Sequence, residues 1–164
     1  EAHALGIPSN CTMLYGHVET LEDRVDHLLA LRALQDESHG FLSYIPLAYH
    51  PDHNELGTAL GRTGTATTGV DDLKNIAVGR LVLDNIPNIQ ASWVTMGMKI
   101  GQIALSYGCN DFGSLMIEEN VVSAANTTYS TTTDEMERLI RDAGFEPRRR
   151  RQNYQLIDTA PAAA

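Results

Sequence analysis

The feature that most constrains the fold of this chain is a regular alternation of short apolar runs and amphipathic stretches. Each apolar run has the composition of a β-strand, and each stretch that follows places its apolar residues at helical spacing. Gly and Pro residues separate most of these segments. We predict strands at 10–15, 41–49, 89–95 and within 109–117, and helices at about 20–37, 73–81, 100–107, 118–125 and 132–144.

This alternation predicts an α/β fold of parallel βαβ units, either in a doubly wound sheet or in a barrel. The order of elements alone does not choose between the two. A complete (β/α)₈ barrel needs roughly 250 residues, so a chain of 164 residues supplies only part of one. A half barrel would leave two open strand edges and an exposed apolar interior, which favours dimerisation or pairing with the missing half.

The net charge of the chain limits the kinds of molecule that it is expected to bind. It has 12 basic and 21 acidic residues and a net charge of −9, which would repel nucleic acids and anionic membrane surfaces. A small organic substrate fits better. We find neither an apolar run of the roughly 20 residues that cross a bilayer nor a signal peptide, so we expect a cytoplasmic protein.

The ends of the chain and its longest loop give further expectations. Residues 1–6 (EAHALG) are typical of the tail of a helix, so we expect the sequence to begin inside a larger protein. We expect one domain over 1–157 and a disordered tail at 158–164. The Gly-rich and Thr-rich loop at 51–69 is long enough to be functional or mobile. Cys11 and Cys109 are interpreted as buried free thiols.

Polar residues that follow the predicted strands are the first candidates for a functional site, because α/β barrels carry their active sites at the carboxyl ends of the strands. After the first strand, His17 and Glu19 lie in a Gly-containing turn before a helix, where an anion or a ribose hydroxyl could bind. Alternatively, Glu19 only complements the helix dipole. The candidates are Tyr15, Gly16, His17, Glu19, His50, Trp93, Asn110, Asp111 and Glu118.

Three other clusters have simpler explanations. His50, Asp52 and His53 offer too few ligands for a metal, so no metal site is predicted. Glu118 and the adjacent Glu119 would point about 100° apart on a helix, so at most one of them faces a site. The basic run at 148–151 is interpreted as a solvated surface rather than an anion site.

Three motifs occur in order along the chain: 12–20 (TMLYGHVET), 34–37 (LQDE) followed by Gly40 and Phe41, and 76–78 (IAV) followed by 83–85 (LDN). Together they resemble the radical S-adenosylmethionine enzymes of the futalosine route to menaquinone, and the related deazaflavin synthases share the outline. The resemblance runs from about residue 1 to residue 157, which is nearly the whole chain.

Two subgroups of that family are represented. Residues 45–51 (IPLAYHP) and 68–74 (TGVDDLK) look more like aminofutalosine synthase. The segments 88–95 (NIQASWVT), 110–114 (NDFGS) and 116–123 (MIEENVVS) resemble cyclic dehypoxanthinyl futalosine synthase. The second set is longer and more distinctive, so we favour the cyclase.

The resemblance implies the C-terminal half of a TIM-type radical S-adenosylmethionine barrel that cyclises dehypoxanthine futalosine. It implies S-adenosylmethionine and a [4Fe–4S] cluster as cofactors, and an electron donor for the cluster as a partner. The implied cofactor-binding residues are Tyr15, Gly16, His17 and Glu19, the implied substrate-binding residues are His50, Trp93 and Asn110, and the implied catalytic residues are Asp111 and Glu118.

The family's cluster-binding pattern C-x-x-x-C-x-x-C does not occur in this sequence. We therefore expect a fragment that is inactive alone, with its cluster ligands outside the chain. Two alternatives stay open: aminofutalosine synthase, and a short protein without a cluster that serves as a binding or assembly module.

Overall fold

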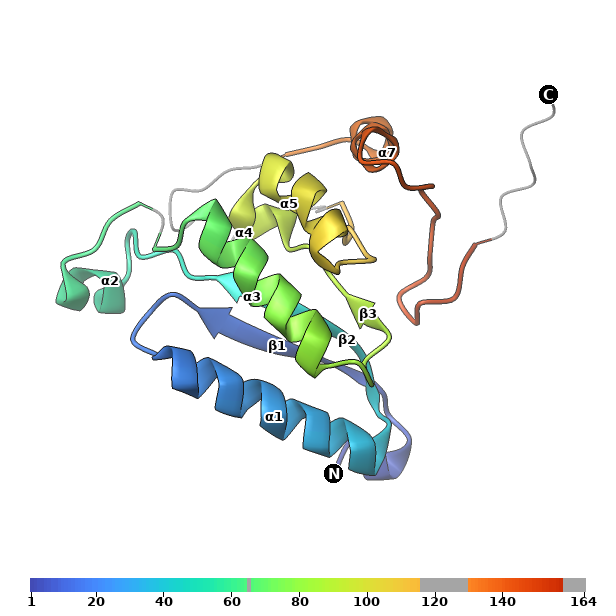
Figure 1. The fold of residues 1–164 in the computed structure, drawn as a ribbon, viewed down its shortest axis with the longest axis horizontal. Helices are drawn as coiled ribbons and strands as arrows, with labels where there is room; N and C mark the ends of the chain where they lie inside the picture. The colour runs from blue at the N-terminus through green and yellow to red at the C-terminus, as the bar shows by residue number, and fades with distance from the viewer. Residues whose placement is uncertain (65, 116–129, 158–164) are drawn as a thin grey trace.

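The computed structural model of the protein describes residues 1–64, 66–115 and 130–157. Its centre is a parallel sheet of β1 (Ser9–Tyr15), β2 (Phe41–Ala48) and β3 (Asn88–Ile89), in that spatial order (Figure 1). An isolated parallel bridge between Gln90 and Asp111 adds a fourth strand position on the free side of β3. The protein is thus a mixed α/β structure with a small parallel sheet, in agreement with the predicted βαβ units.

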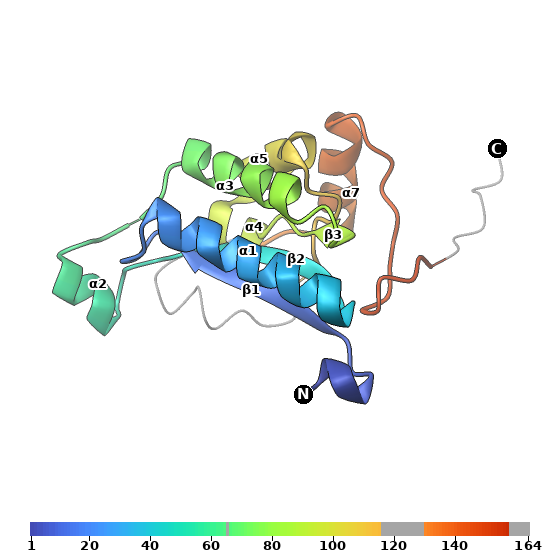
Figure 2. The ribbon, with the colours of Figure 1, turned by 60° about the horizontal axis from the view of Figure 1, so that its bottom comes forward.

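Two long helices, α1 (Leu21–Ser38) and α3 (Gly69–Val82), cover one face of this sheet (Figures 1 and 2). Each begins with a capping box, in which a Thr hydroxyl accepts a hydrogen bond from the backbone three residues later and an Asp side chain returns one. The box of Thr20 and Asp23 confirms the sequence prediction. The equivalent box before α3 places the start of that helix four residues earlier than the apolar spacing indicated.

The core lies between the sheet and these helices. Successive side chains of a strand point to opposite faces, and β1 follows this rule: Cys11, Met13 and Tyr15 are buried, whereas the residues between them are exposed. Leu14 is 51% exposed on the face opposite α1 and α3. No residue of β2 is exposed, but Leu42, Ile45 and Leu47 are only half-buried, so the predicted burial on both sides is met in part.

The predicted strand at 89–95 is wrong beyond Gln90, whose N–H still donates to the carbonyl of Tyr44 at 3.0 Å. The N–H of Ala91 then pairs with the carbonyl of Asp111 at 2.8 Å, and the N–H of Trp93 donates back to the carbonyl of Ala91 at 2.9 Å. The short helix α4 (Trp93–Met96) follows at once, and the Thr95 hydroxyl donates to the carbonyl of Ser92 at 3.0 Å. Local hydrogen bonds of this kind compete with strand pairing, and here they prevail.

The long loop contains a helix that the sequence did not indicate, α2 (Glu55–Leu60). Asn54 caps it by accepting the N–H of Gly57 at 2.8 Å, and Gly61 ends it in a left-handed conformation with φ 62°. A Cβ on Gly57 would lie 1.8 Å from the carbonyl oxygen of Pro51, so only glycine allows this helix to pack on the loop.

The rest of the described chain packs beside β3. Helix α5 (Met98–Ala104), the 3₁₀ helix η2 (Leu105–Tyr107) and α7 (Thr133–Asp142) correspond to predicted helices, and a 3₁₀ turn, η1 (His3–Leu5), ends at Gly6 as expected. Within 109–115 only the Asp111 bridge represents the predicted short strand. The predicted helix at 118–125 and the tail at 158–164 lie outside the described residues. Among the described helices, none has the length and apolarity to cross a membrane.

Candidate functional site

The carboxyl ends of β1 and β2 meet at one edge of the sheet. Tyr15 and Ala48 are register partners, and the N–H of Tyr49 donates to the carbonyl of Tyr15 at 2.9 Å. The turn after β1 therefore lies directly beside the loop after β2. The rings of His17 and Tyr49 meet edge to face, with their centroids 6.0 Å apart.

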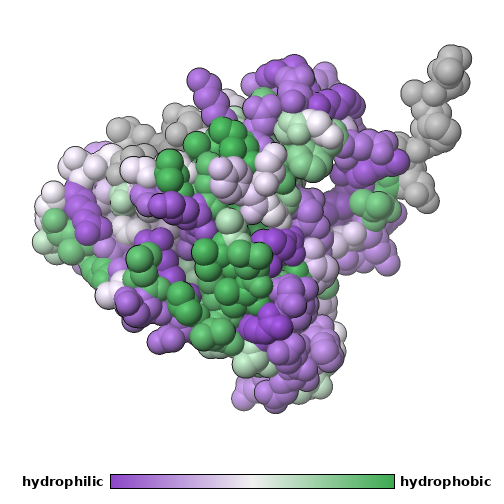
Figure 3. Space-filling view, in the orientation of Figure 1, coloured by the Kyte–Doolittle hydropathy of each residue, from purple (hydrophilic) through white to green (hydrophobic). Residues whose placement is uncertain are grey.

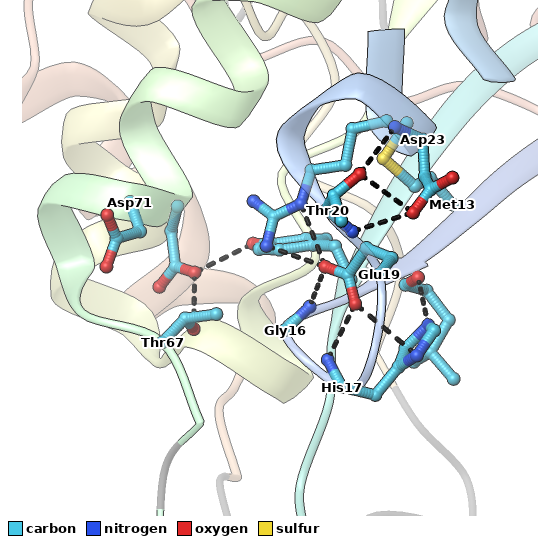
Figure 4. A network of polar contacts seen from close by, with 12 residues as sticks. Met13, Gly16, His17, Glu19, Thr20, Asp23, Thr67 and Asp71 are labelled. Carbon is cyan, nitrogen blue, oxygen red and sulfur yellow. Dashed lines mark hydrogen bonds and ion pairs between the residues drawn. The ribbon is translucent and has the colours of Figure 1, made fainter. Parts of the chain in front are cut away.

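Glu19 organises the turn after β1 from within. Its two carboxylate oxygens accept the backbone N–H groups of Gly16 at 2.5 Å and His17 at 2.8 Å (Figure 4). Arg24, one turn into α1, donates to the same carboxylate from Nε at 2.8 Å and Nη2 at 2.6 Å. Both oxygens of Glu19 are thus engaged by the protein, which favours a role in shaping the turn.

The protonation of Glu19 follows from these contacts. Partial burial opposes its ionisation, but the hydrogen bonds from Gly16, His17 and Arg24 outweigh that effect and lower its pKa below the usual value. Glu19 therefore carries its charge over the whole neutral range. The resulting carboxylate fixes two amide groups that would otherwise be open to a ligand.

Tyr15 lies beneath the edge and does not face it. Its side chain is fully buried, and its hydroxyl donates to Oδ1 of Asp72 in α3 at 2.8 Å. The Thr67 hydroxyl donates to the same oxygen at 2.8 Å (Figure 4). Burial raises the pKa of Asp72 despite these two donors. Asp72, Thr67 and Arg24 were missed at the sequence level, because only the fold brings them to this turn.

The carbonyl groups of the same turn contact the long loop. Nη1 of Arg62 donates to the carbonyl oxygens of Gly16 at 3.1 Å and His17 at 2.6 Å. Thr67 lies so close that its Cγ2 would be 2.6 Å from a Cβ on Gly16, whose φ is 91°. The prediction that the loop at 51–69 is functional remains a prediction, but its structure ties it to the candidate turn.

His50 is buried at the end of β2. Its Nε2 lies 2.8 Å from the carbonyl oxygen of Thr95, so the imidazole links β2 to α4. Its neighbours Asp52 and His53 do not complete a metal site with it, and the described residues contain no group of three His, Cys, Asp or Glu that could hold a metal ion. Asp52 instead accepts the N–H of Gly64 at 2.8 Å.

Trp93 lies in α4, after β3, whereas Asn110 contacts the start of β3. Trp93, at the start of α4, is 2% exposed and its indole N–H has no hydrogen-bond acceptor in the part of the chain that the structure describes. The side-chain oxygen of Asn110 accepts the N–H of Ile89 at 2.8 Å and a donor of Arg80 at 3.1 Å. Asn110 therefore has a structural role, because these contacts hold the fourth strand position against β3.

Asp111 is paired with the C-terminal segment. Its Oδ2 accepts from Nε and Nη2 of Arg150 at 3.0 and 2.5 Å, and its Oδ1 accepts the N–H of Gly113 at 2.9 Å. The Arg150 guanidinium also lies 4.0 Å from the ring centre of Tyr154. The interpretation of 148–151 as a solvated surface is therefore wrong for Arg150, whose partner is a buried carboxylate.

The structure brings Tyr15, Gly16, His17, Glu19 and His50 to one part of the edge. Asn110 and Asp111 lie beside β3 at the fourth strand position, and Trp93 lies at the start of α4. Glu118 lies outside the described residues. The assignment of these residues to cofactor, substrate or catalysis remains a prediction.

The fold and this edge define an α/β protein with its candidate site at the carboxyl ends of parallel strands. The chain belongs to the family described as the CofH/MqnC C-terminal region, whose model matches residues 38–163. The resemblance found in the sequence is thereby confirmed.

Three curated relatives represent three reactions. The chain is 49% identical over 158 residues to aminodeoxyfutalosine synthase of Thermus thermophilus, covering 95% of this chain and 42% of the relative. It is 46% identical over 155 residues to cyclic dehypoxanthine futalosine synthase of Halalkalibacterium halodurans, covering 94% and 40%.

The third relative is 5-amino-6-(D-ribitylamino)uracil–L-tyrosine 4-hydroxyphenyl transferase 1 of Methanosarcina acetivorans, 42% identical over 164 residues, covering 98% of this chain and 44% of the relative. The chain therefore spans about two-fifths of the length of these relatives.

Proposed function

We propose that the chain is the C-terminal part of a radical S-adenosylmethionine enzyme of the futalosine pathway that cyclises dehypoxanthine futalosine. The observation that carries this proposal is the family match over 38–163, joined to a turn after β1 that carries the motif at 12–20. The relative named cyclic dehypoxanthine futalosine synthase supports this substrate. Aminodeoxyfutalosine synthase is the second candidate, favoured by the 49% identity to the enzyme of that name.

The sheet order supports a barrel half over a doubly wound sheet. A doubly wound sheet reverses its strand order at a switch point, whereas here β1, β2, β3 and Asp111 follow one another in space as they do in sequence. In a barrel, the face of β1 opposite α1 and α3, with Thr12 and Leu14, would form part of the interior. We propose that residues of the longer protein complete that barrel.

The cysteines of this chain do not fit an iron–sulfur cluster. Cys11 and Cys109 are each 5% exposed, and burial raises the pKa of both thiols to about 12, which disfavours the thiolates that ligate iron. The cluster of the proposed enzyme would have to be held by residues outside this chain.

The turn after β1 fits the organic cofactor better. The backbone groups of Gly16 and His17 are all bonded, and the partly exposed His17 ring, which packs edge to face on the buried Tyr49, offers an aromatic surface for an adenosyl group. When bound and reduced by one electron from the cluster, S-adenosylmethionine would supply a 5′-deoxyadenosyl radical, with methionine as the other product, to abstract hydrogen from the substrate. In this proposal the residues Tyr15 to Glu19 orient the cofactor, and His50, Trp93 and Asn110 line the substrate side.

Asp111 and Glu118 are the proposed catalytic carboxylates. Asp111 accepts hydrogen bonds from Arg150 and from the Gly113 N–H, and in this proposal its carboxylate oxygens would also contact the substrate. Its position beside Gln90 puts it at the carboxyl end of β3. Glu118 enters this proposal only through the family resemblance.

The decisive experiment is to purify the full-length gene product, reconstitute its cluster and assay it with each of the two futalosine-pathway substrates. We expect conversion of dehypoxanthine futalosine to its cyclic form. Turnover of the aminodeoxyfutalosine synthase substrate alone would support the second candidate. A protein that turns over neither, although it carries a cluster and binds S-adenosylmethionine, would contradict both.

The competing class is a short binding or assembly module without a cluster. The genomic sequence upstream of residue 1 separates the two: an open frame that encodes the cysteine motif supports the enzyme, and an in-frame start codon beside residue 1 supports the module. The 164-residue chain alone should not form 5′-deoxyadenosine. Detection of this product with the isolated chain would overturn that expectation.

The proposed setting is a cytoplasmic enzyme with a small-molecule substrate and an electron donor, and without nucleic-acid or membrane partners. Self-association is also part of the proposal, because apolar side chains gather over α1 and α3 on one surface (Figure 3). The exposed large apolar residues of these helices are Leu21, Val25, Leu29, Leu34, Val70, Val78 and Leu81. Light scattering of the full-length protein tests this, and a monomer would contradict it.

A further inference from the structure

The turn after β1 is held from two sides by opposite charges. Glu19 accepts both of its amide groups, from Gly16 and His17, and Arg62 donates to both of the corresponding carbonyl oxygens. Hydrogen bonds with one charged partner are stronger than neutral ones. The four backbone polar groups of this two-residue turn are therefore all fixed, two by an anion and two by a cation.

The position of Arg62 is set by the end of α2. Gly61 adopts the left-handed conformation, and the N–H of Arg62 then donates to the carbonyl of Gly57 at 3.0 Å. This arrangement is a common helix C-terminus, and it fixes the direction in which the next side chain leaves the helix. Because Gly57 itself packs on the backbone of Pro51, α2 is anchored to the end of β2. The backbone that carries Arg62 is therefore held in place by α2.

The same loop contacts the turn at a second point. The methyl group of Thr67 lies against Gly16, while the Thr67 hydroxyl donates to Asp72, the residue that also accepts from Tyr15. Between these points, the N–H of Gly64 is bonded to Asp52. The described part of the loop is therefore tied to its surroundings at Arg62, Gly64 and Thr67.

We propose that Arg62 is a positioning residue for the cofactor: it holds the backbone of Gly16 and His17 in the place where the Leu14 carbonyl and Glu19 contact the two ring nitrogens of His17, the ring against which the adenosyl part of S-adenosylmethionine binds. This inference rests on the proposed function for the identity of the ligand. Arg62 acts through the turn and does not itself touch the reacting atoms. It would control the affinity for the cofactor, while the rate of the chemical step would depend on other residues.

If Arg62 had a purely structural role, its loss would lower kcat rather than raise the KM for S-adenosylmethionine. The positioning role predicts the reverse. Its side chain is exposed, and exposed charged contacts contribute little to the free energy of unfolding. Loss of Arg62 should therefore leave stability nearly unchanged and still raise the KM for S-adenosylmethionine. The split between KM and kcat separates the two roles, because a structural defect lowers the amount of active enzyme and with it kcat.

The test uses the reconstituted full-length enzyme with R62Q, R62K and the matched control R138Q. Arg138 is also exposed, but its ion pair with Asp142 lies on α7. We expect R62Q to raise the KM for S-adenosylmethionine about tenfold, which corresponds to about 1.4 kcal/mol, with kcat within about twofold of wild type. R62K, which keeps the charge but not the fork of donors, should recover part of the loss. R138Q should match wild type.

Hydrogen–deuterium exchange without cofactor gives a second readout. R62Q should speed exchange of the Gly16 and His17 amides about tenfold, while exchange in α1 stays unchanged. Wild-type KM values and wild-type exchange in R62Q would overturn the inference. If wild-type enzyme itself does not bind S-adenosylmethionine, the proposed function fails, whereas faster exchange in R62Q would still show that Arg62 holds the turn.

Discussion

The turn after β1 and the end of β3 lie along one sheet, yet their polar groups are satisfied in different ways. In the turn, all backbone groups of Gly16 and His17 find partners at Glu19 and Arg62, within the same two βα units. At β3, Asp111 takes its cation from Arg150, 39 residues further along the chain.

The end of β3 also keeps an unpaired donor. The buried indole N–H of Trp93 has no acceptor among the described residues. A buried donor without an acceptor costs free energy, so within the described residues this region is less fully hydrogen-bonded than the turn after β1. The turn after β1, by contrast, is complete as it stands. The first region is therefore preformed, whereas the second depends on distant parts of the chain.

Breaking the distant contact should have the largest effect. We expect Arg150→Met to lower the free energy of unfolding by about 3 kcal/mol, because it leaves the buried Asp111 carboxylate without its cation. Urea unfolding followed by circular dichroism measures this loss. The matched control is Arg148→Met, since Arg148 pairs with Glu146 on the surface, and it should cost at most about 0.5 kcal/mol. Equal losses in the two variants would contradict the assignment.

A methyl group at Gly16 tests the preformed turn. We expect Gly16→Ala to destabilise the protein by about 2 kcal/mol, because φ is 91° and the new Cβ would lie 2.6 Å from the Thr67 methyl group. Gly144→Ala is the control: φ is 88° there, but nothing lies within 4 Å of the added Cβ. Its cost should be about 1 kcal/mol, from backbone strain alone. If urea unfolding shows the same loss of unfolding free energy in both variants, the close approach of Thr67 to Gly16 does not add to the cost of the methyl group.

The sequence was sufficient where the determinants are local. Helix α1 follows from a capping box and helical spacing, and the turn at Gly16 to Glu19 follows from a strand that ends before a helix. The strand at 89–95 was wrong beyond Gln90, where the Trp93 N–H bonds to the Ala91 carbonyl and the Thr95 hydroxyl to the Ser92 carbonyl as α4 begins. Periodicity carries no information about such hydrogen bonds.

The contacts that Arg62 and Asp72 make around the turn after β1 could not be predicted from the sequence for the same reason. Arg62 reaches the turn only because α2 ends at Gly61, and α2 itself depends on the contact of Gly57 with Pro51. Asp72 was visible only as part of a motif, and its bond to Tyr15 spans 57 positions. Residues that act through space across βα units leave no local signal.

Removing one buried donor should have a moderate effect. We expect Tyr15→Phe to cost about 1–2 kcal/mol, because Asp72 loses one of its two side-chain donors while the space in the core stays filled. Tyr107→Phe, at a site that is 45% exposed, is the control and should change stability by less than about 0.5 kcal/mol. The midpoint of thermal unfolding reports both, and a neutral Tyr15→Phe would mean that the bond does not stabilise the fold.

The smallest effect, and the most diagnostic, is the pH dependence of two adjacent carboxyls. Burial raises the pKa of Asp72, so between its unfolded and folded pKa values the native state binds more protons, and its contribution to stability falls as pH rises. Hydrogen bonds from Thr68 lower the pKa of Asp71, so its contribution is present above the unfolded pKa and is lost as pH falls through the folded pKa.

The two asparagine variants should therefore respond to pH with opposite signs. Relative to wild type, Asp72→Asn should become more stable as pH rises from acid to neutral, since its amide oxygen still accepts from Tyr15 and Thr67. At neutral pH it should lie within about 1 kcal/mol of wild type. Asp71→Asn should become less stable over the same range. Urea unfolding at several pH values measures both slopes. Slopes of the same sign would show that Asp72 is not held in the buried, doubly bonded state that closes the turn after β1.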